Sequence, residues 1–202
     1  MDSYNNYKIA RDKAWRNLIK YKINSLPVDV LDVCKKAGVG VYTYVNGKSI
    51  LEDYRIQINT ENEGFTTKIN GKYVIFYNDT ITPKSRIIFT IAHEMGHIAL
   101  GHARTGVTIW NRGEQAEPAP EETQANIFAS RLLAPACVIK EMDIHTAEEL
   151  QEITGLSYTA AKIRLERLNQ LRARDKFYLS PLEREVKSNF KRFIKNYQRK
   201  QV

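Results

Sequence analysis

The spacing of apolar residues in the N-terminal part of the chain predicts helices followed by a small sheet. An amphipathic helix is expected over residues 4–22, where apolar side chains recur three or four positions apart, and a second helix over 27–38. Between residues 39 and 79 the pattern changes to runs of β-branched and aromatic residues, which predict strands. The dipeptide Asn70-Gly71 within these runs favours the tight turn of a β-hairpin.

Beyond the hairpin, the pattern predicts a mainly helical second half. A long helix is expected over residues 83–101, because Pro83 suits a first helical turn and Gly101 suits a helix end. A loop rich in glycine, proline and acidic residues should follow over 105–120. The next helix is expected over 120–133 and should stop before Pro135.

Together these elements predict an α+β fold, in which a small β-sheet with a hairpin packs on helices and a helical C-terminal region follows. We expect residues 1–140 to form one domain and residues 141–202 to form a basic helical region. Within that region, residues 146–169 contain a helix, a glycine turn and a second helix, an arrangement similar to a helix-turn-helix.

Basic charge is concentrated at the C-terminal end of the chain. The net charge of the 202 residues is +8, yet residues 155–202 alone hold 13 lysines and arginines but only 4 aspartates and glutamates, a net charge of +9. Such a surface can attract nucleic acid or an acidic partner, although a solvated helical tail explains the charge equally well. The helical spacing of Phe190, Phe193 and Tyr197 favours packing on the body of the protein over stacking on bases.

The sequence offers no sign of secretion or of a membrane span. The N-terminal residues are polar and charged, which argues against a signal peptide, and the apolar runs are too short to cross a bilayer. Cys34 and Cys137 lie far apart in the sequence and are expected to be reduced, buried thiols. We therefore expect a cytoplasmic protein with no membrane partner.

The segment HEMGH, residues 93–97, carries the clearest chemical signal. On a helix, His93 and His97 project from the same face one turn apart, so both imidazoles can bind one Zn²⁺. Glu94 lies beside that face, as in the H-E-x-x-H arrangement of zinc hydrolases, where zinc acidifies water and the glutamate takes its proton. Two core histidines satisfied by ordinary hydrogen bonds are the less favoured alternative.

A catalytic zinc site needs a third protein ligand, which the spacing leaves open. His102 lies five residues after His97 and would point about 140° away from it on a continuous helix, so it is expected to cap the helix or support a ligand. Glu122 is the better candidate, with Asn126 on the same face to orient a histidine. Glu122 also suits the first turn of a helix simply because acids are favoured there.

Two blocks of sequence resemble the ImmA/IrrE family of zinc metallopeptidases. RIIFTIAHEMGHIALGH resembles the family pattern R-x-x-F-T-x-A-H-E-x-G-H, and ETQANIFASRLLAP resembles E-x-x-A-N-x-F-A-x-x-L-L-x-P. The blocks occur in the family's order, and the likeness extends over roughly residues 5–170. By position, the resemblance implies that His93, His97 and Glu122 bind zinc and that Glu94 is the catalytic base, on a zincin-type, gluzincin-like scaffold.

The resemblance also implies a function. Members of this family are cytoplasmic proteases, often encoded on phages, on mobile elements or in stress operons, and several cleave a helix-turn-helix repressor and thereby switch genes on. A substrate peptide could bind as an added strand beside residues 72–77. The alternative is a non-catalytic DNA- or repressor-binding regulator that uses the basic region 155–202.

Overall fold

The computed structural model describes residues 3–59, 61–103, 119–178 and 180–200. Its helices are α1 (Ser3–Lys20), α2 (Val30–Ala37), α3 (Lys48–Asp53), α4 (Lys84–Leu100), α5 (Pro120–Leu133), α6 (Ala136–Glu141), α7 (Ala147–Thr154), α8 (Tyr158–Ala173), α9 (Pro181–Asn189) and α10 (Lys191–Gln198). Its strands are β1 (Gly40–Thr43), β2 (Gly64–Ile69) and β3 (Lys72–Tyr77). The α+β class is therefore confirmed. The predicted loop over 105–120 lies almost wholly outside the described residues.

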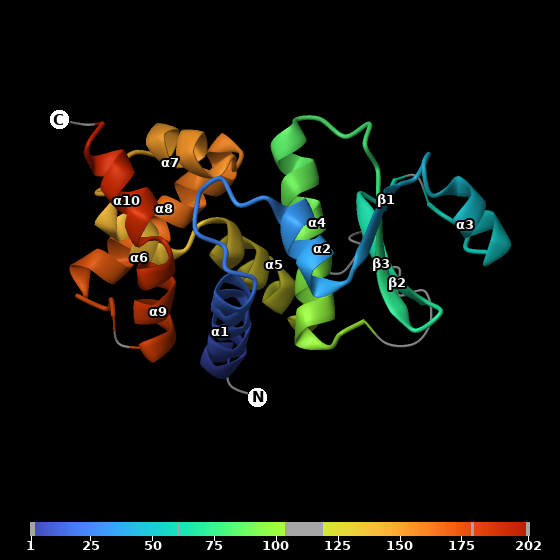
Figure 1. The fold of residues 1–202 in the computed structure, drawn as a ribbon, viewed down its shortest axis with the longest axis horizontal. Coiled ribbons are helices and arrows are strands. Elements are labelled where there is room, and N and C mark those ends of the chain that lie inside the picture. Colours follow the sequence, from blue (N-terminus) through green and yellow to red (C-terminus); the bar gives the residue numbers. More distant parts are fainter. Residues whose placement is uncertain (1–2, 60, 104–118, 179, 201–202) are drawn as a thin grey trace.

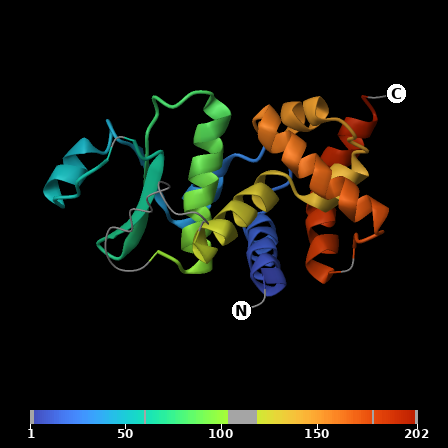
Figure 2. The ribbon, with the colours of Figure 1, turned by 180° about the vertical axis from the view of Figure 1, so that it is seen from behind.

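The elements form three groups along the long axis of the molecule. Figure 1 shows the sheet and α3 at one end, α1, α2, α4 and α5 in the middle, and α6 to α10 at the other end. The view from behind shows the same order, with α5 leading from α4 towards the C-terminal helices (Figure 2). No helix in the described ranges is long and apolar enough to cross a membrane.

The sheet has the order β1-β3-β2, and this order corrects one expectation. β3 pairs in parallel with β1 and antiparallel with β2, so it is the central strand. A substrate peptide therefore cannot add beside residues 72–77, because the main-chain groups on both sides of β3 are already paired. The hairpin turn is as predicted: Asn70 and Gly71 have φ of 49° and 78°, the two positive values that a type I′ turn requires.

Two local differences from the predicted elements have simple causes. α2 begins at Val30 rather than at Pro27, because the Asp29 side chain accepts hydrogen bonds from the main-chain N–H groups of Leu31 and Asp32 and so caps the helix there. The short helix α3 was not predicted, since its six residues are too few to establish a helical repeat.

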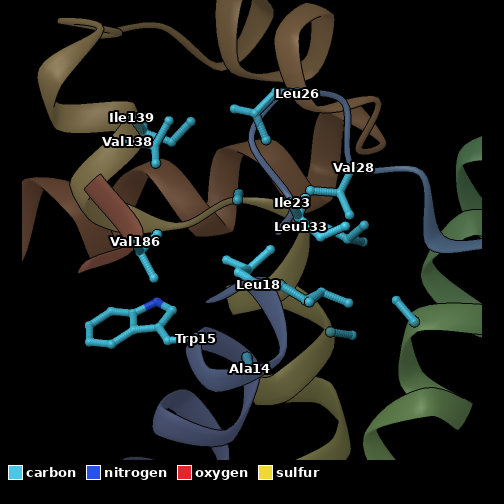
Figure 3. Packing of buried hydrophobic residues seen from close by; sticks show 14 of the residues in the cluster. Ala14, Trp15, Leu18, Ile23, Leu26, Val28, Leu133, Val138, Ile139 and Val186 are labelled. Atoms are coloured by element: carbon cyan, nitrogen blue, oxygen red, sulfur yellow. The ribbon is translucent and has the colours of Figure 1, made fainter. Parts of the chain in front are cut away.

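One cluster of buried hydrophobic residues runs from α1 to α10. Figure 3 shows part of it, with Leu18 of α1, Leu133 of α5 and Val186 of α9 among the labelled residues. Phe190 is fully buried, and Phe193 and Tyr197 pack against the same cluster, so the aromatic stripe packs on the body as expected. The cluster includes residues on both sides of position 140, where the division into two regions stays a prediction.

The second helix of the helix-turn-helix-like segment turns one of its basic side chains, Arg164, towards the body of the protein. Gly155 ends α7 in the left-handed conformation, and α8 follows after the Ser157 cap, as in the predicted pattern. Arg164 on α8 is only 2% exposed and donates two hydrogen bonds to the main-chain oxygen of Ala134. This buried arginine cannot reach a DNA groove, so this face of α8 packs rather than reads bases.

Helices α4 and α5 approach closely at Gly96. A Cβ atom built at Gly96 would lie 3.1 Å from Cδ1 of Phe128 and 3.2 Å from the main-chain oxygen of Ala125, both on α5. These distances are tighter than ordinary van der Waals contact, and a main-chain oxygen within a helix cannot easily move away. A glycine at position 96 therefore sets the distance between the two helices.

We predict that Gly96→Val lowers the free energy of unfolding by about 1–3 kcal/mol, because its γ-carbons would overpack the contact with Ala125 and Phe128. Urea unfolding followed by circular dichroism measures the change. Lys84→Val is the control, since it places the same side chain at an exposed position of α4. Equal stability of Gly96→Val and the wild type would contradict the tight crossing.

Candidate metal centre

Three side chains from two helices converge at the crossing of α4 and α5. His93 and His97 are 1% and 0% exposed, and their Nε2 atoms lie 2.9 Å apart. Glu122, in the first turn of α5, places Oε2 3.2 Å from His93 Nε2 and Oε1 3.1 Å from His97 Nε2. The candidate ligand atoms of the three residues all lie within 4.8 Å of one another. The structure thus brings together the pair given by the helical spacing and the carboxylate from the second helix.

Asn126 fixes the proton of His93. Its Oδ1 atom lies 2.9 Å from Nδ1 of His93, and an amide oxygen can only accept, so Nδ1 carries the hydrogen. In the neutral imidazole the lone pair is then on Nε2, the atom that faces His97 and Glu122. Asn126 lies one turn after Glu122 on α5, so one helix supplies both the carboxylate and the group that orients a histidine.

His102 and Gln124 orient His97 in the same way. The Oε1 atom of Gln124 lies 2.8 Å from Nε2 of His102, which places the hydrogen of His102 on Nε2 and leaves its Nδ1 as an acceptor. That Nδ1 lies 3.3 Å from Nδ1 of His97, which can therefore donate. The lone pair of His97 then lies on Nε2, towards His93 and Glu122. His102 reaches His97 because Gly101 ends α4 in the left-handed conformation and redirects the chain.

The arrangement of protons fits a bound cation. Two imidazole lone pairs and a carboxylate face the same point, and three acceptors without a proton between them repel one another unless a positive charge lies there. Oε1 of Glu122 is buried and, with the lone pair of His97 on Nε2, has no hydrogen-bond donor among the described residues, so it is an acceptor that a cation would satisfy. The three residues are therefore a candidate metal site.

The electrostatics of Glu122 favour its charged form. Burial acts to raise the pKa of this carboxyl group. When His93 and His97 are protonated on Nε2, their hydrogen bonds and positive charge outweigh the burial and bring the pKa of Glu122 well below its usual range. For His102, burial lowers the pKa more than the hydrogen bond to Gln124 raises it, which favours the neutral imidazole assumed above. A metal bound here would take the place of the Nε2 protons of His93 and His97, with the carboxylate ionised and the two imidazoles neutral.

Glu94 lies next to the three candidate ligands but is not one of them. It is 3% exposed, and its Oε2 atom accepts a hydrogen bond of 2.8 Å from the hydroxyl of Thr66 on β2. The carboxylate is therefore attached to the sheet on one side and follows His93 directly on α4. The hydrogen bond from Thr66 restricts the rotation of Glu94, so the carboxylate is positioned before any substrate arrives.

Some groups around the site were not predicted, and others lie outside the described residues. Thr66 and Gln124 gave no signal of their own, because a hydroxyl in a strand and an amide in a helix are common at positions without chemical function. The sequence does not identify an oxyanion donor, and Tyr73, Tyr77, Trp110 and Arg112 are candidates only because flanking segments could reach the site. Of these, Trp110 and Arg112 lie outside the described residues. The hydroxyl of Tyr73 donates a hydrogen bond of 3.4 Å to the main-chain oxygen of Ala103.

The comparison with protein families agrees with this geometry. The fold and the cluster of two histidines and a glutamate define a metallopeptidase-like protein, and the family model described as the IrrE N-terminal-like domain matches residues 51–166. The match covers more than half of the chain and includes every candidate site residue. The chain therefore belongs to the ImmA/IrrE peptidase family. No curated protein matches the sequence.

We predict that Glu122→Gln weakens metal binding, because the amide removes the anionic ligand from the cluster of three candidate ligands. The loss should exceed the roughly 10–100-fold that is typical when only a residue that orients a ligand is removed. The metal content of protein purified without chelating resin, measured by elemental mass spectrometry, provides the test.

Glu121→Gln is the matched control, since it removes the same charge one residue earlier on α5 and should leave the metal content unchanged. Full metal content in Glu122→Gln would move the third ligand to another residue, with His102 the next to test.

Proposed function

We propose that the chain is a zinc-dependent metallo-endopeptidase. The observation that carries this proposal is the convergence of His93, His97 and Glu122 beside a separately positioned carboxylate, Glu94, in a chain of a peptidase family. Two imidazole nitrogens and one carboxylate are a donor set of catalytic zinc sites. When bound there, zinc would supply a Lewis acid that polarises the peptide carbonyl and acidifies water.

In this proposal, Glu94 is the general base and then the general acid. Its carboxylate accepts a proton from the attacking water as oxygen bonds to the peptide carbon. It then passes the proton to the departing nitrogen when the C–N bond breaks, so that water is consumed and an acid and an amine are formed. Thr66 holds one oxygen of Glu94 throughout and acts as a positioning residue.

The substrate peptide is proposed to lie along β2. This strand is at one edge of the three-stranded sheet, and its Thr66 contacts Glu94, so a chain extended beside β2 would pass close to the base. Among the described residues, the other edge strand, β1, makes no hydrogen bond or ion pair with the site residues and is therefore the less favoured position.

We further propose a helix-turn-helix transcriptional repressor as the protein substrate, so that its cleavage would derepress phage, mobile-element or stress genes. The support for this substrate is the resemblance to the ImmA/IrrE family, several of whose members cut such repressors. The inward position of Arg164 supports a protein substrate over DNA reading by α8. A weak nucleic-acid contact elsewhere in residues 155–202 stays a prediction.

We predict that Glu94→Gln lowers the rate of repressor cleavage by about 10²–10⁴-fold or more, because the amide cannot accept the proton of water, while zinc content and folding stay unchanged. The measurement uses purified helix-turn-helix repressors from the same genome, with fragments detected by mass spectrometry.

Glu121→Gln is again the control. Unchanged cleavage by Glu94→Gln would contradict the proposed base. A zinc-loaded wild type that cuts none of the repressors but binds them or DNA would favour the non-catalytic regulator.

We predict that Thr66→Val lowers kcat by about 10-fold with KM and zinc content unchanged, because the loss of one hydrogen bond to a charged group leaves Glu94 less well oriented. Thr66→Ser should restore most of kcat, since it keeps the hydroxyl. A loss of activity that Thr66→Ser does not recover would indicate a packing role for the threonine methyl group instead.

A further inference from the structure

A second cluster of charged side chains lies away from the metal centre, in a cleft of about 720 Å³ between α1, α5, α8 and the segment that leads into α9. Its lining holds eight lysines and arginines but only two carboxylates. One carboxylate, Asp12, pairs with Arg11 at 2.7 Å, and the other belongs to the buried Glu183. The lining therefore carries a large excess of positive charge.

Four arginines surround one tyrosine in this cleft. The guanidinium carbons of Arg131, Arg167 and Arg11 lie 5.3, 5.4 and 6.0 Å from the centre of the Tyr7 ring. Burial acts to raise the pKa of Tyr7, but the charge and hydrogen bonding of Arg131, with the charges of Arg164 and Arg167, outweigh it and bring the pKa below its ordinary value. The positive potential is thus strong enough to favour a negative charge at this point.

Two of these guanidinium groups are buried with an unused donor. Arg164 is 2% exposed and gives Nε and Nη2 to the main-chain oxygen of Ala134, but its Nη1 has no partner among the described residues. Arg131 is 9% exposed and gives Nη1 to Ser130, while its Nε likewise has no partner there. In the described part of the chain no carboxylate pairs with Arg131, Arg164 or Arg167, and buried charges without counter-charges are costly.

We propose that this cleft binds a small phosphate ester of the nucleoside phosphate class. Guanidinium groups that approach from three helices need acceptors in several directions, which a tetrahedral phosphate offers and a planar carboxylate does not. The volume of the cleft lies in the range of binding sites for small organic ligands and is larger than a bare phosphate ion would fill. The recessed donors of Arg131 and Arg164 favour a small molecule over a nucleic-acid strand, which would lie across the surface.

The experiment measures binding of ADP to the full-length chain by isothermal titration calorimetry without divalent cations. Arg167→Gln should weaken ADP binding by roughly 10–100-fold, because it removes a charged hydrogen-bond donor from the cleft. Lys162→Gln is the matched control, since it removes one positive charge from an exposed position of the same helix and should have little effect. Glu122→Gln should bind ADP as the wild type does, which separates the cleft from the metal centre.

Thermal unfolding of the wild-type chain provides a second test that needs no variant. ADP should raise the unfolding midpoint, and adenosine, which lacks the phosphates, should not. The proposal is overturned if ADP neither binds nor raises the midpoint, if adenosine acts equally, or if Lys162→Gln weakens binding as much as Arg167→Gln. Binding of a single-stranded oligonucleotide without binding of ADP would also overturn it, and would favour a nucleic-acid site.

Discussion

The close approach of α4 and α5 at Gly96 is the constraint on which the rest of the site depends. Because position 96 has no side chain, the main chain of Ala125 can lie against α4. Two α5 residues then reach the histidines: Glu122, about one turn before Ala125, and Asn126, directly after it. Glu122 faces both Nε2 atoms, and Asn126 faces the outer nitrogen of His93. A larger side chain at position 96 would separate the helices and move both groups away together.

The molecule contains two clusters of buried polar groups with opposite requirements. At the candidate metal centre the protons are held on the outer nitrogens of His93 and His97, so only acceptors face the centre, and a cation satisfies them. In the described lining of the arginine-lined cleft, the buried side-chain atoms without a partner are donors, on Trp15, Arg131 and Arg164, which the proposed anion would satisfy. The same rule, that a buried polar group needs a partner, indicates a metal in one place and an anionic ligand in the other.

The two clusters are joined by α5. Its first turn carries Glu122, its last turn carries Arg131, and the oxygen of Ala134 at its end accepts both hydrogen bonds from Arg164. These bonds satisfy a main-chain oxygen that the helix itself leaves without a donor. The C-terminal helices therefore contribute directly to holding the helix that completes the candidate metal centre, and they also share one hydrophobic cluster with the rest of the chain.

The sequence alone determined the features that depend on neighbouring residues. These are the α+β class, the hairpin turn at Asn70-Gly71, and the pairing of His93 with His97 through the helical repeat. It could not decide by spacing between Glu122 and other third ligands, and it placed a peptide beside β3, which proved to be the central strand. Only the tertiary structure decided the order of the strands, the contact of Thr66 with Glu94 and the gathering of arginines around Tyr7, because each joins segments that are distant in the chain and no local pattern records which of them meet.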